Sequence, residues 1–567
     1  MAAVVSATSK PWLASYSGEM KPHVEEVPYR LLGDIATQAA RRTPDKVAFT
    51  CVMPNGMAGS LTYGEVDRLS DQFAAYLSGE LRLAPGSRVA IQAPNGLAYP
   101  VVAFGVFKAG CTLVNVNPLY VAEETAAVFA DAEISALVVI DMFAKRTEAV
   151  LTVTPVPHVV LVSAAEFFPV VPRTVIGFVQ KRIRKEIPPA AFPHIRLATA
   201  LAQGRARLAR GLKIADITAG LDPSAVACLQ YTGGTTGVSK GAMLTHANLI
   251  MNVLQVLAFA GSKISQNDTI LTALPLYHIF AFMVNFLTFA ARSGHIVMVP
   301  NPRPLANLRK VFEKYPISFI TGVNTLFNGL LNESWFVALP KPHLKICVAG
   351  GMALQAAVAE RWAKIVGVPL GEGYGLTETS PVVCFNPLGS YRPGTIGIPI
   401  PDTDVKCVDE DFNEVPAGTP GELAVRGAQV MAGYWRYSDE TAKVMRGDWI
   451  LTGDIATMDP DGYFRIVDRR KDMILVSGFN VFPNEVEDVL ARLPGIREAA
   501  VIGVPDGAAG EAPKAFVVRS DPAITAEMVR SHCKAHLTGY KVPKFVEFRD
   551  DLPKSNVGKI LRRELRA

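Results

Sequence analysis

Short apolar runs alternate with segments of helical periodicity along most of the chain. Between these runs, apolar residues recur every three to four positions, as in 62–77, where Thr62 precedes the pattern as an N-cap. Apolar strands that alternate with helices indicate largely parallel sheets covered by helices on both faces. The runs of strand length lie at 88–94, 135–141, 158–163, 268–275, 295–300 and 343–351.

The pattern changes after Gly394. Residues 394–427 contain short strand patterns separated by Pro and Gly turns, which predict a small β-rich subdomain. A polar junction follows at 467–473, and the remaining segment has the pattern of helix, strand and strand. We therefore predict a multi-domain α/β protein. Its large N-terminal domain, residues 1–467, has layered sheets covered by helices plus the β-rich subdomain, and its small, mobile α+β C-terminal domain spans 468–567.

Composition supports a globular protein of several domains. A length of 567 residues exceeds one ordinary core, and 49% hydrophobic with 19% charged residues excludes a disordered or fibrous chain. The net charge of +5 is too small for a dedicated nucleic-acid binder. The cysteines form no C-x-x-C pair, so we expect neither a zinc site nor disulfides but small buried side chains. The N-terminus lacks the pattern of a secretory signal, so we expect a cytoplasmic protein.

Two segments raise the question of membrane contact. The stretch between Asp268 and Arg292 is uncharged, but its Pro275 and Asn285 favour a buried segment that lines an apolar cavity over a membrane span. Residues 167–185 combine apolar with basic side chains. Two interpretations stay open for them: a surface helix that touches anionic lipid headgroups, and a solvated helix packed on its own domain.

The strongest local motif is the loop YTGGTTGVSKG, residues 231–241. Its glycines let backbone N–H groups approach an anion, its hydroxyls donate to phosphate oxygens, and Lys240 supplies charge. The spacing differs from the Walker A motif, because Lys240 is followed by glycine. This loop therefore predicts phosphate binding of another kind.

Further candidate groups follow along the chain. In GEGYGLTETSP, residues 371–381, Tyr374 offers a flat face for adenine, and Glu378 offers oxygens for Mg²⁺. In the triplet 452–454, the Asp454 carboxylate follows a tight turn and can accept two ribose hydroxyls. Near the C-terminus, LPKSNVGKILRREL places Lys559 in a Ser/Asn/Gly loop.

Together and in this order, these motifs resemble the ANL superfamily of adenylate-forming enzymes. The resemblance runs from about Leu31 to Leu565 and includes PLYHIF, VAGGMAL, TGD and DRRKDMILVSGFNVFPNEVE. The sequences of these motifs are most similar to those of the bacterial long-chain fatty acyl-CoA synthetases. The resemblance implies two half-reactions: a carboxylate attacks the α-phosphate of Mg·ATP to give acyl-adenylate and pyrophosphate, and the thiol of CoA then displaces AMP.

The resemblance also implies roles for individual residues. Lys559 would bridge the acyl carboxylate and the α-phosphate, and Thr377 and Glu378 would serve the α-phosphate and Mg²⁺, with Thr235 as a second metal contact. Lys471 aligns with the residue about which the small domain turns, and Asp468 is its rival. The other implied contacts are Thr232, Gly233, Gly234, Thr235, Thr236, Gly237 and Lys240 for the β- and γ-phosphates; Gly351, Met352, Ala353, Tyr374 and Gly375 for adenine; Asp454 for the ribose; Arg469 for the ribose or a phosphate; and Gly478, Phe479 and Asn480 for the pantetheine arm of CoA.

One motif departs from the broader superfamily. Where its last motif commonly has Thr and a second hydroxyl, this chain has Ser555, Asn556 and Val557. The long-chain bacterial branch has the same residues at these positions, so the departure favours that branch.

The acyl pocket is the least specific part of this interpretation. His278 and Phe280 are candidates for its wall near the carboxylate, with His278 counted among the catalytic residues. Val323, Thr325 and Leu326 are candidates for the path of the acyl chain. Each buried methylene contributes about 0.8 kcal/mol, so an apolar tunnel holds a fatty chain without specific polar contacts. Each of these residues could instead simply fill the core.

We therefore expect a ligase that uses a long-chain fatty acid, ATP with Mg²⁺, and CoA, and that binds no nucleic acid. The same chemistry on a medium-chain or aromatic acid is the nearest alternative. A fatty acid-binding protein and a module that loads a carrier protein are further alternatives. Peripheral contact with the inner face of the membrane and a homodimer also stay open.

Overall fold

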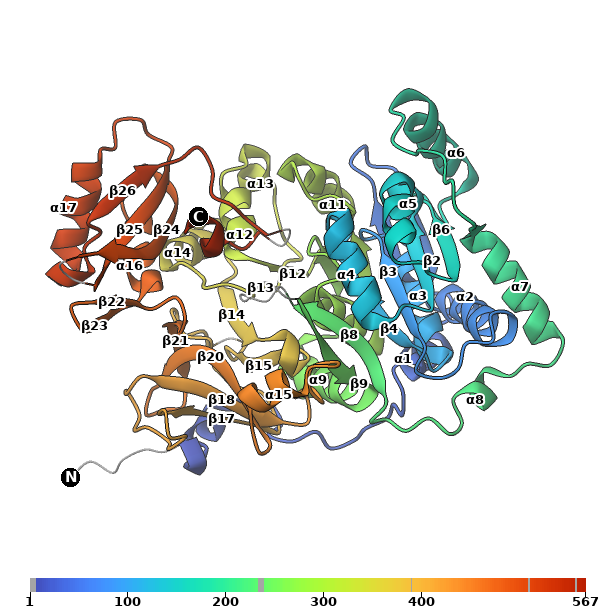
Figure 1. The fold of residues 1–567 in the computed structure, drawn as a ribbon, viewed down its shortest axis with the longest axis horizontal. Helices are drawn as coiled ribbons and strands as arrows, with labels where there is room; N and C mark the ends of the chain where they lie inside the picture. The colour runs from blue at the N-terminus through green and yellow to red at the C-terminus, as the bar shows by residue number, and fades with distance from the viewer. Residues whose placement is uncertain (1–6, 233–238, 389, 508–509, 556–557, 567) are drawn as a thin grey trace.

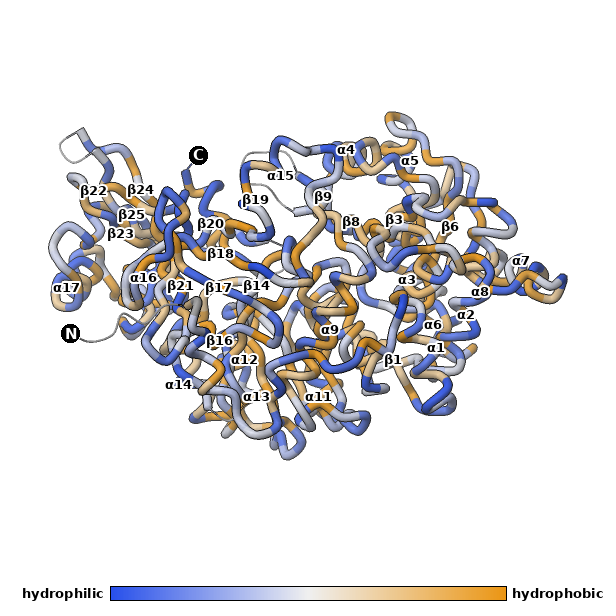
Figure 2. The backbone as a smooth tube through the Cα atoms, turned by 90° about the horizontal axis from the view of Figure 1, so that it is seen from below, coloured by the Kyte–Doolittle hydropathy of each residue, from blue (hydrophilic) through white to orange (hydrophobic). Residues whose placement is uncertain are grey.

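A computed structural model describes residues 7–232, 239–388, 390–507, 510–555 and 558–566. Its described residues form two large, mostly parallel sheets, one small antiparallel sheet and a C-terminal sheet (Figure 1). This is the layered α/β architecture that the alternating pattern predicts. Hydrophobic positions gather in the middle of the molecule, and many outer turns are hydrophilic (Figure 2).

The first large sheet has the strand order β16-β15-β14-β13-β12-β10-β11-β1-β2. The strands from β14 to β1 run parallel, and the outer strands at both edges are antiparallel. The strand bounds are β1 (Val47–Val52), β2 (Ala58–Thr62), β10 (Thr269–Thr272), β11 (His295–Met298), β12 (Phe319–Gly322), β13 (Ile346–Ala349), β14 (Leu370–Gly375), β15 (Val382–Phe385) and β16 (Ile398–Pro399).

The second large sheet has the order β7-β6-β5-β3-β4-β8-β9 and is parallel except for the β8–β9 hairpin. Its strands are nearly all buried, as a sheet covered on both faces requires. Their bounds are β3 (Arg88–Gln92), β4 (Thr112–Asn115), β5 (Ala136–Ile140), β6 (His158–Val162), β7 (Ile195–Arg196), β8 (Val226–Thr232) and β9 (Lys240–Thr245).

Helices fill the layers beside these sheets. Helix α2 begins as the sequence predicts: the Thr62 hydroxyl accepts the Glu65 N–H at 3.2 Å, and the Glu65 carboxylate accepts the Thr62 N–H at 2.8 Å. The helices of the N-terminal part are α1 (Gly33–Arg42), α2 (Tyr63–Ala75), α3 (Ala98–Lys108), α4 (Ala122–Ala132), α5 (Ala144–Val153), α6 (Val170–Phe178), α7 (Leu197–Ala209), α8 (Ile214–Ile217), α9 (His246–Ala260), α10 (Phe289–Ala291), α11 (Arg309–Lys314), α12 (Asn324–Leu331), α13 (Ser334–Ala338), α14 (Ala356–Val366) and α15 (Ser438–Val444).

The uncharged segment 269–291 lies in the core. Phe286 is fully buried, and its ring centroid is 4.8 Å from that of Phe104 and 5.7 Å from that of Phe49. Among the described residues, we find no helix with the length and apolar character that a membrane span requires. The seven cysteines are all buried and unpaired, as expected.

The predicted β-rich subdomain is an antiparallel sheet with the order β17-β18-β20-β19, and β21 pairs with β20. Its strands are β17 (Thr403–Val408), β18 (Gly421–Gly427), β19 (Met445–Arg446), β20 (Trp449–Met458) and β21 (Phe464–Arg469). Its buried side chains join the large N-terminal core. It is therefore a subdomain of the N-terminal part.

The C-terminal part has its own sheet, order β23-β22-β25-β24 with β26 beside β25, and lies at one end of the molecule (Figure 1). Its two apolar clusters draw only on residues from Ile474 onward, whereas the N-terminal cluster ends at Phe464. The boundary after residue 467 and the mobility of this part stay predictions. Its elements are β22 (Ile474–Val476), β23 (Phe479–Val481), α16 (Pro483–Ala491), β24 (Ile496–Asp506), β25 (Gly510–Arg519), α17 (Ala526–His536) and β26 (Phe545–Phe548).

Candidate functional site

Four parallel strands bring several of the predicted site residues to one edge of the first sheet. Strands β10, β12, β13 and β14 are neighbours, and the carboxyl ends of parallel neighbours meet at the same edge. The carboxyl ends of these strands, or the segments that follow them, carry His278, Val323, Gly351 and Tyr374, respectively. The order of the strands, which the sequence does not reveal, thus places distant motifs side by side.

The predicted ribose site is a compact hydrogen-bonded corner. The Tyr374 hydroxyl donates to the Asp454 carboxylate at 2.6 Å, and Arg469 Nε lies 3.3 Å from the other carboxylate oxygen. Asp454 and Arg469 are paired across strands β20 and β21. Burial, with the charge of Asp454 beside it, raises the pKa of Tyr374 well above its usual value. The Asp454 carboxylate is thus placed beside two donors, in the position of a group that accepts ribose hydroxyls.

Lys559 reaches this corner from the C-terminal part. The Gly558 carbonyl accepts a hydrogen bond from the Thr325 hydroxyl at 3.2 Å. Gly558 has a φ of +86°, and a Cβ there would lie 2.6 Å from the Thr325 hydroxyl oxygen, so only glycine permits this approach. Burial, together with the positive charge of Arg469, lowers the pKa of Lys559 to about 7. The positive side chains near Lys559, namely Arg469, Lys471 and Arg562, outnumber the nearby Asp454 carboxylate, so the site is poised to take up an anion.

His278 faces the same site as a neutral side chain. Burial and the nearby charge of Lys559 lower the pKa of His278 to about 4. The Phe280 N–H donates to His278 Nδ1 at 3.4 Å, which leaves the ring proton on Nε2. Neutral His278 can therefore donate one hydrogen bond from Nε2.

The phosphate-loop prediction falls partly outside the described residues, which exclude Gly233, Gly234, Thr235, Thr236 and Gly237, and also Asn556 and Val557. On the two flanks of the loop, Ser239 Oγ donates to the Thr232 carbonyl at 2.6 Å. Lys240 Nζ donates to Glu440 on α15 at 2.6 Å and lies 4.8 Å from the centre of the Tyr434 ring.

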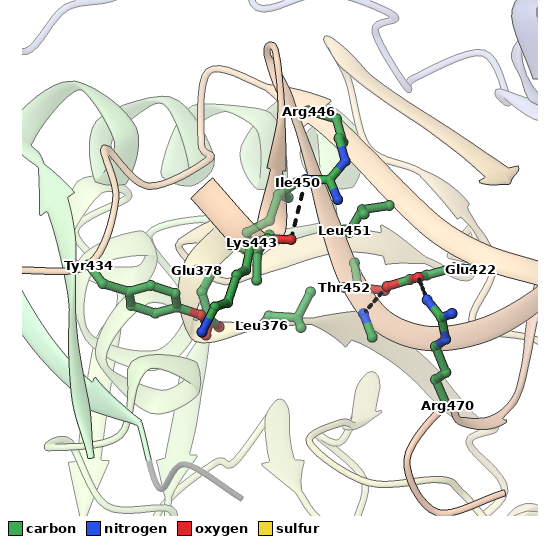
Figure 3. A pocket seen from close by; sticks show the side chains of 12 residues that line it. Leu376, Glu378, Glu422, Tyr434, Lys443, Arg446, Ile450, Leu451, Thr452 and Arg470 are labelled. Carbon is green, nitrogen blue, oxygen red and sulfur yellow. Dashed lines mark hydrogen bonds and ion pairs between the residues drawn. The ribbon is translucent and has the colours of Figure 1, made fainter. Parts of the chain in front are cut away.

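Glu378 opens onto a cavity of about 240 Å³ (Figure 3). The Tyr434 hydroxyl donates to the Glu378 carboxylate at 2.7 Å, and Thr452 and Gly453 also line the cavity. The cavity therefore lies between Glu378 and the turn that precedes Asp454, two segments of the predicted nucleotide site. Its lining residues are Leu376, Glu378, Glu422, Tyr434, Lys443, Val444, Arg446, Ile450, Leu451, Thr452, Gly453 and Arg470.

A single carboxylate stands at the predicted metal position. Among the described residues, no three His, Cys, Asp or Glu side chains gather as a metal cluster. Mg²⁺ that arrives with ATP needs no such cluster, because phosphates and water fill most of its coordination sites. The Tyr434 hydroxyl bonds to Oε1 of Glu378, so Oε2 can serve as the one protein ligand of such a Mg²⁺ ion.

The predicted adenine loop is held at its C-terminal end. The Leu354 N–H donates to the Glu372 carboxylate at 3.1 Å, and the Gln355 N–H donates to Asn324 Oδ1 at 3.1 Å. Burial raises the pKa of Glu372 to about 8. Gly351 and Ala353 are exposed, and Met352 is half-buried. The loop thus presents its open face while its end is fastened to β14 and α12.

The predicted acyl residues lie next to this loop. A Cβ on Gly350 would lie 3.1 Å from the Phe280 ring, and one on Gly351 would lie 3.8 Å from Val323. Val323 and Leu326 are buried. The structure therefore groups Phe280, Val323, Thr325 and Leu326 beside Lys559, but their contact with an acyl chain stays a prediction.

The residues predicted for CoA lie away from this group. Gly478, Phe479 and Asn480 form the exposed β22–β23 turn at the outer end of the molecule (Figure 1), where the Phe479 ring stacks on Tyr540 at 4.9 Å. At the junction, Lys471 is exposed. Asp468 is fully buried and accepts the Asn484 N–H at 2.8 Å. This arrangement brings Lys559, not the CoA residues, to the nucleotide corner.

Sequence reasoning missed several groups that the structure places at the site. Tyr434 and Glu440 carry no local motif, and only their contacts with Glu378 and Lys240 identify them. Arg562 lies three residues after Lys559, so that proximity is the one signal that could have found it. Its guanidinium donates to Asn484 Oδ1 at 2.7 Å and to both Glu487 oxygens at 2.8 Å.

Known proteins match the chain over nearly its whole length. Residues 36–435 match the family described as AMP-binding enzyme, and 485–559 match the AMP-binding enzyme C-terminal domain. A relative from Escherichia coli O6:H1 named long-chain-fatty-acid–CoA ligase is 47% identical over 98% of both chains. A feruloyl-CoA synthase of an Amycolatopsis species is 33% identical over 94% of this chain and 98% of its own.

A solved structure of ATP-bound MatB from Rhodopseudomonas palustris is similar with a TM-score of 0.79 at 27% identity, covering 94% of this chain and 98% of that one. Fold, motif order and full-length sequence agreement lead to one assignment. The chain belongs to the AMP-binding family of adenylate-forming enzymes.

Proposed function

We propose that this protein is an AMP-forming long-chain fatty acid–CoA ligase. The observation that carries the proposal is the position of Lys559. The hydrogen bond between Thr325 and Gly558 holds the Lys559 loop of the C-terminal part beside Tyr374, Asp454 and Arg469. The full-length similarity to long-chain-fatty-acid–CoA ligases supports the same activity.

The first half-reaction forms an acyl-adenylate. A carboxylate oxygen of the fatty acid attacks the α-phosphorus of ATP, and the bond from that phosphorus to the pyrophosphate oxygen breaks. The Lys559 ammonium lies between the two anions and reduces their repulsion as they approach. Asp454 holds the ribose, and Thr377 lies beside the α-phosphate. Glu378 would hold the Mg²⁺ that accompanies ATP and balances phosphate charge.

The second half-reaction forms the thioester. The CoA sulfur attacks the acyl carbon, the bond from that carbon to the AMP oxygen breaks, and the thiol proton leaves to solvent. In the observed arrangement the β22–β23 turn is remote from the corner, so the C-terminal part turns about the junction near Lys471 between the two steps. This rotation delivers Gly478, Phe479 and Asn480 to the pantetheine arm.

The acyl pocket sets which acid is activated. Phe280, Val323 and Leu326 offer apolar surface, and each methylene buried against it contributes about 0.8 kcal/mol, which favours long chains. The feruloyl-CoA synthase relative keeps an aromatic acid as the second candidate substrate. We also place the enzyme in the cytoplasm, in peripheral contact with the inner face of the membrane, where long-chain acids partition.

Pyrophosphate release by the purified protein tests this function. Mg·ATP is supplied with acids from butyrate to stearate and with 4-coumarate, each with and without CoA. We expect a CoA-stimulated signal that is highest for long chains. Lys559→Ala is the inactive control, and Lys534→Ala on exposed α17 is the matched active one. If no acid supported pyrophosphate release, the ligase assignment would be rejected. If release were highest with 4-coumarate, the long-chain assignment would be rejected.

A further inference from the structure

Helix α6 and the turn that continues it to residue 185 expose apolar side chains that soluble proteins usually bury. The exposed fractions are 67% for Val170, 72% for Val171, 40% for Val175, 58% for Phe178 and 64% for Ile183. This segment lies at the outer end of the molecule, beyond α5 and β6 (Figure 1). Such a concentration of exposed apolar surface indicates an interaction site.

The orientation of α6 makes this exposure systematic. Ile176 and Gln180 are the buried positions of the segment, and Gln180 Nε2 donates to Met142 Sδ at 3.4 Å. Val171, Val175 and Phe178, spaced four and three residues apart, share the opposite face. An ordinary surface helix directs its apolar stripe to the core and its polar side to water, whereas α6 directs an apolar stripe to water.

The charge of the segment has one sign. Every charged residue from 167 to 185 is basic, and all of them are exposed. In the described part of the chain, Arg184 is the one member of this set with an ion pair, at 3.5 Å from Glu186. The basic residues are Arg173, Lys181, Arg182, Arg184 and Lys185.

We propose that residues 170–185 form a docking surface for an anionic lipid bilayer. Val171, Val175 and Phe178 enter the boundary between headgroups and acyl chains, while the basic side chains contact lipid phosphates. The charge complementarity decides the occupant, because a second copy of this chain would place five cations against five cations at a two-fold contact. Docking there brings the enzyme to the phase that holds long-chain acids, and this purpose alone rests on the proposed function.

Vesicle flotation of the full-length protein tests the surface. The vesicles contain phosphatidylcholine alone or with phosphatidylglycerol. We expect binding to the anionic vesicles that weakens as salt is added. A triple variant, Val171→Ser with Val175→Ser and Phe178→Ser, should bind at least about tenfold more weakly, since it removes the inserting apolar area.

Two further variants separate the contributions. Arg173→Gln, Lys181→Gln, Arg182→Gln and Lys185→Gln together should abolish the preference for anionic vesicles, because each cation contributes about fivefold. A matched control, Val27→Ser with Val337→Ser and Met528→Ser, removes exposed apolar side chains elsewhere and should bind as the parent does. Equal binding by all variants, or no binding by the parent, would overturn the proposal. So would a loss of dimer mass on light scattering in the α6 variant.

An activity comparison keeps this proposal apart from the ligase assignment. With water-soluble octanoate the α6 triple variant should match the parent, whereas with oleate presented in anionic vesicles its rate should fall several-fold. Inactivity of both proteins on both acids would reject the ligase while leaving the flotation result valid. Equal rates on vesicle-borne oleate would overturn the purpose we assign to docking.

Discussion

The Arg562 guanidinium donates two hydrogen bonds of 2.8 Å to the Glu487 carboxylate. It also contacts Asn484 and Asp468 at the junction of the N-terminal and C-terminal parts. The Glu487 side chain is only 14% exposed, and its burial raises its pKa to about 7 despite the opposing charge of Arg562. Arg562 thus ties the loop that carries Lys559 to α16 and to the end of β21.

Arg562→Gln should therefore displace the Lys559 loop as well as weaken the C-terminal part. Loss of one partner of a buried charge pair costs about 3–5 kcal/mol, which urea unfolding would measure. Adenylation, followed by pyrophosphate release below the unfolding transition, should fall much more than CoA attack on supplied acyl-adenylate. Glu487→Gln keeps the Asn484 bond of Arg562 and should retain more adenylation. Equal loss in both half-reactions would reduce Arg562 to a purely structural role.

Lys559→Ala should lower acyl-adenylate formation by at least about a hundredfold, because it removes the cation between two approaching anions. Thioester formation from supplied acyl-adenylate should change little, since under the rotation we propose that step uses another orientation of the C-terminal part. Single-turnover assays of each step check this expectation. Lys559 would lose its catalytic assignment if both steps slowed together.

The lowered pKa of Lys559 also predicts a pH-dependent cost in stability. The unfolded side chain has a pKa of about 10.4, whereas the folded one has a pKa of about 7. The unfolded chain therefore binds more protons between these values, so the cost is full below pH 7 and disappears as pH rises toward 10. Lys559→Met should raise the melting temperature at pH 7 and raise it less at pH 9, with Lys534→Met as control. A difference that grows with pH would contradict the burial of this ammonium group.

Lys471→Pro should separate the two half-reactions in the opposite sense. Proline restricts the backbone rotation about which the C-terminal part is expected to turn. We expect near-normal pyrophosphate release in the first turnover and thioester formation slower by at least about tenfold. If Asp468→Pro alone gave that pattern, the hinge would lie three residues earlier.

Tyr434→Phe should weaken the position of Glu378 without removing the ring beside Lys240. A hydrogen bond to a charged group contributes about 1.5–3 kcal/mol, so its loss predicts about tenfold slower adenylation. The effect should appear in the dependence of the rate on Mg²⁺ concentration. Tyr437→Phe, on the same segment, is the control. A normal magnesium dependence in Tyr434→Phe would separate Glu378 from the metal.

The sequence predicted well those features that local chemistry decides. Strand-length apolar runs and the Thr62 cap identified elements that the structure confirms, because periodicity and capping act within a few residues. The order of motifs identified the family, which the full-length matches confirm. The glycine before Lys559 and the basic composition of 167–185 were likewise visible in the chain.

Only the tertiary structure decided which of these residues meet. The parallel order of β10, β12, β13 and β14 places His278, Val323, Gly351 and Tyr374 at one edge, and strand order depends on packing between distant segments. The partners Tyr434, Glu440 and Arg562 became visible through contacts made across many residues. The outward face of α6 could be read only once Ile176 showed which side is buried, because periodicity identifies a stripe but does not identify what it faces.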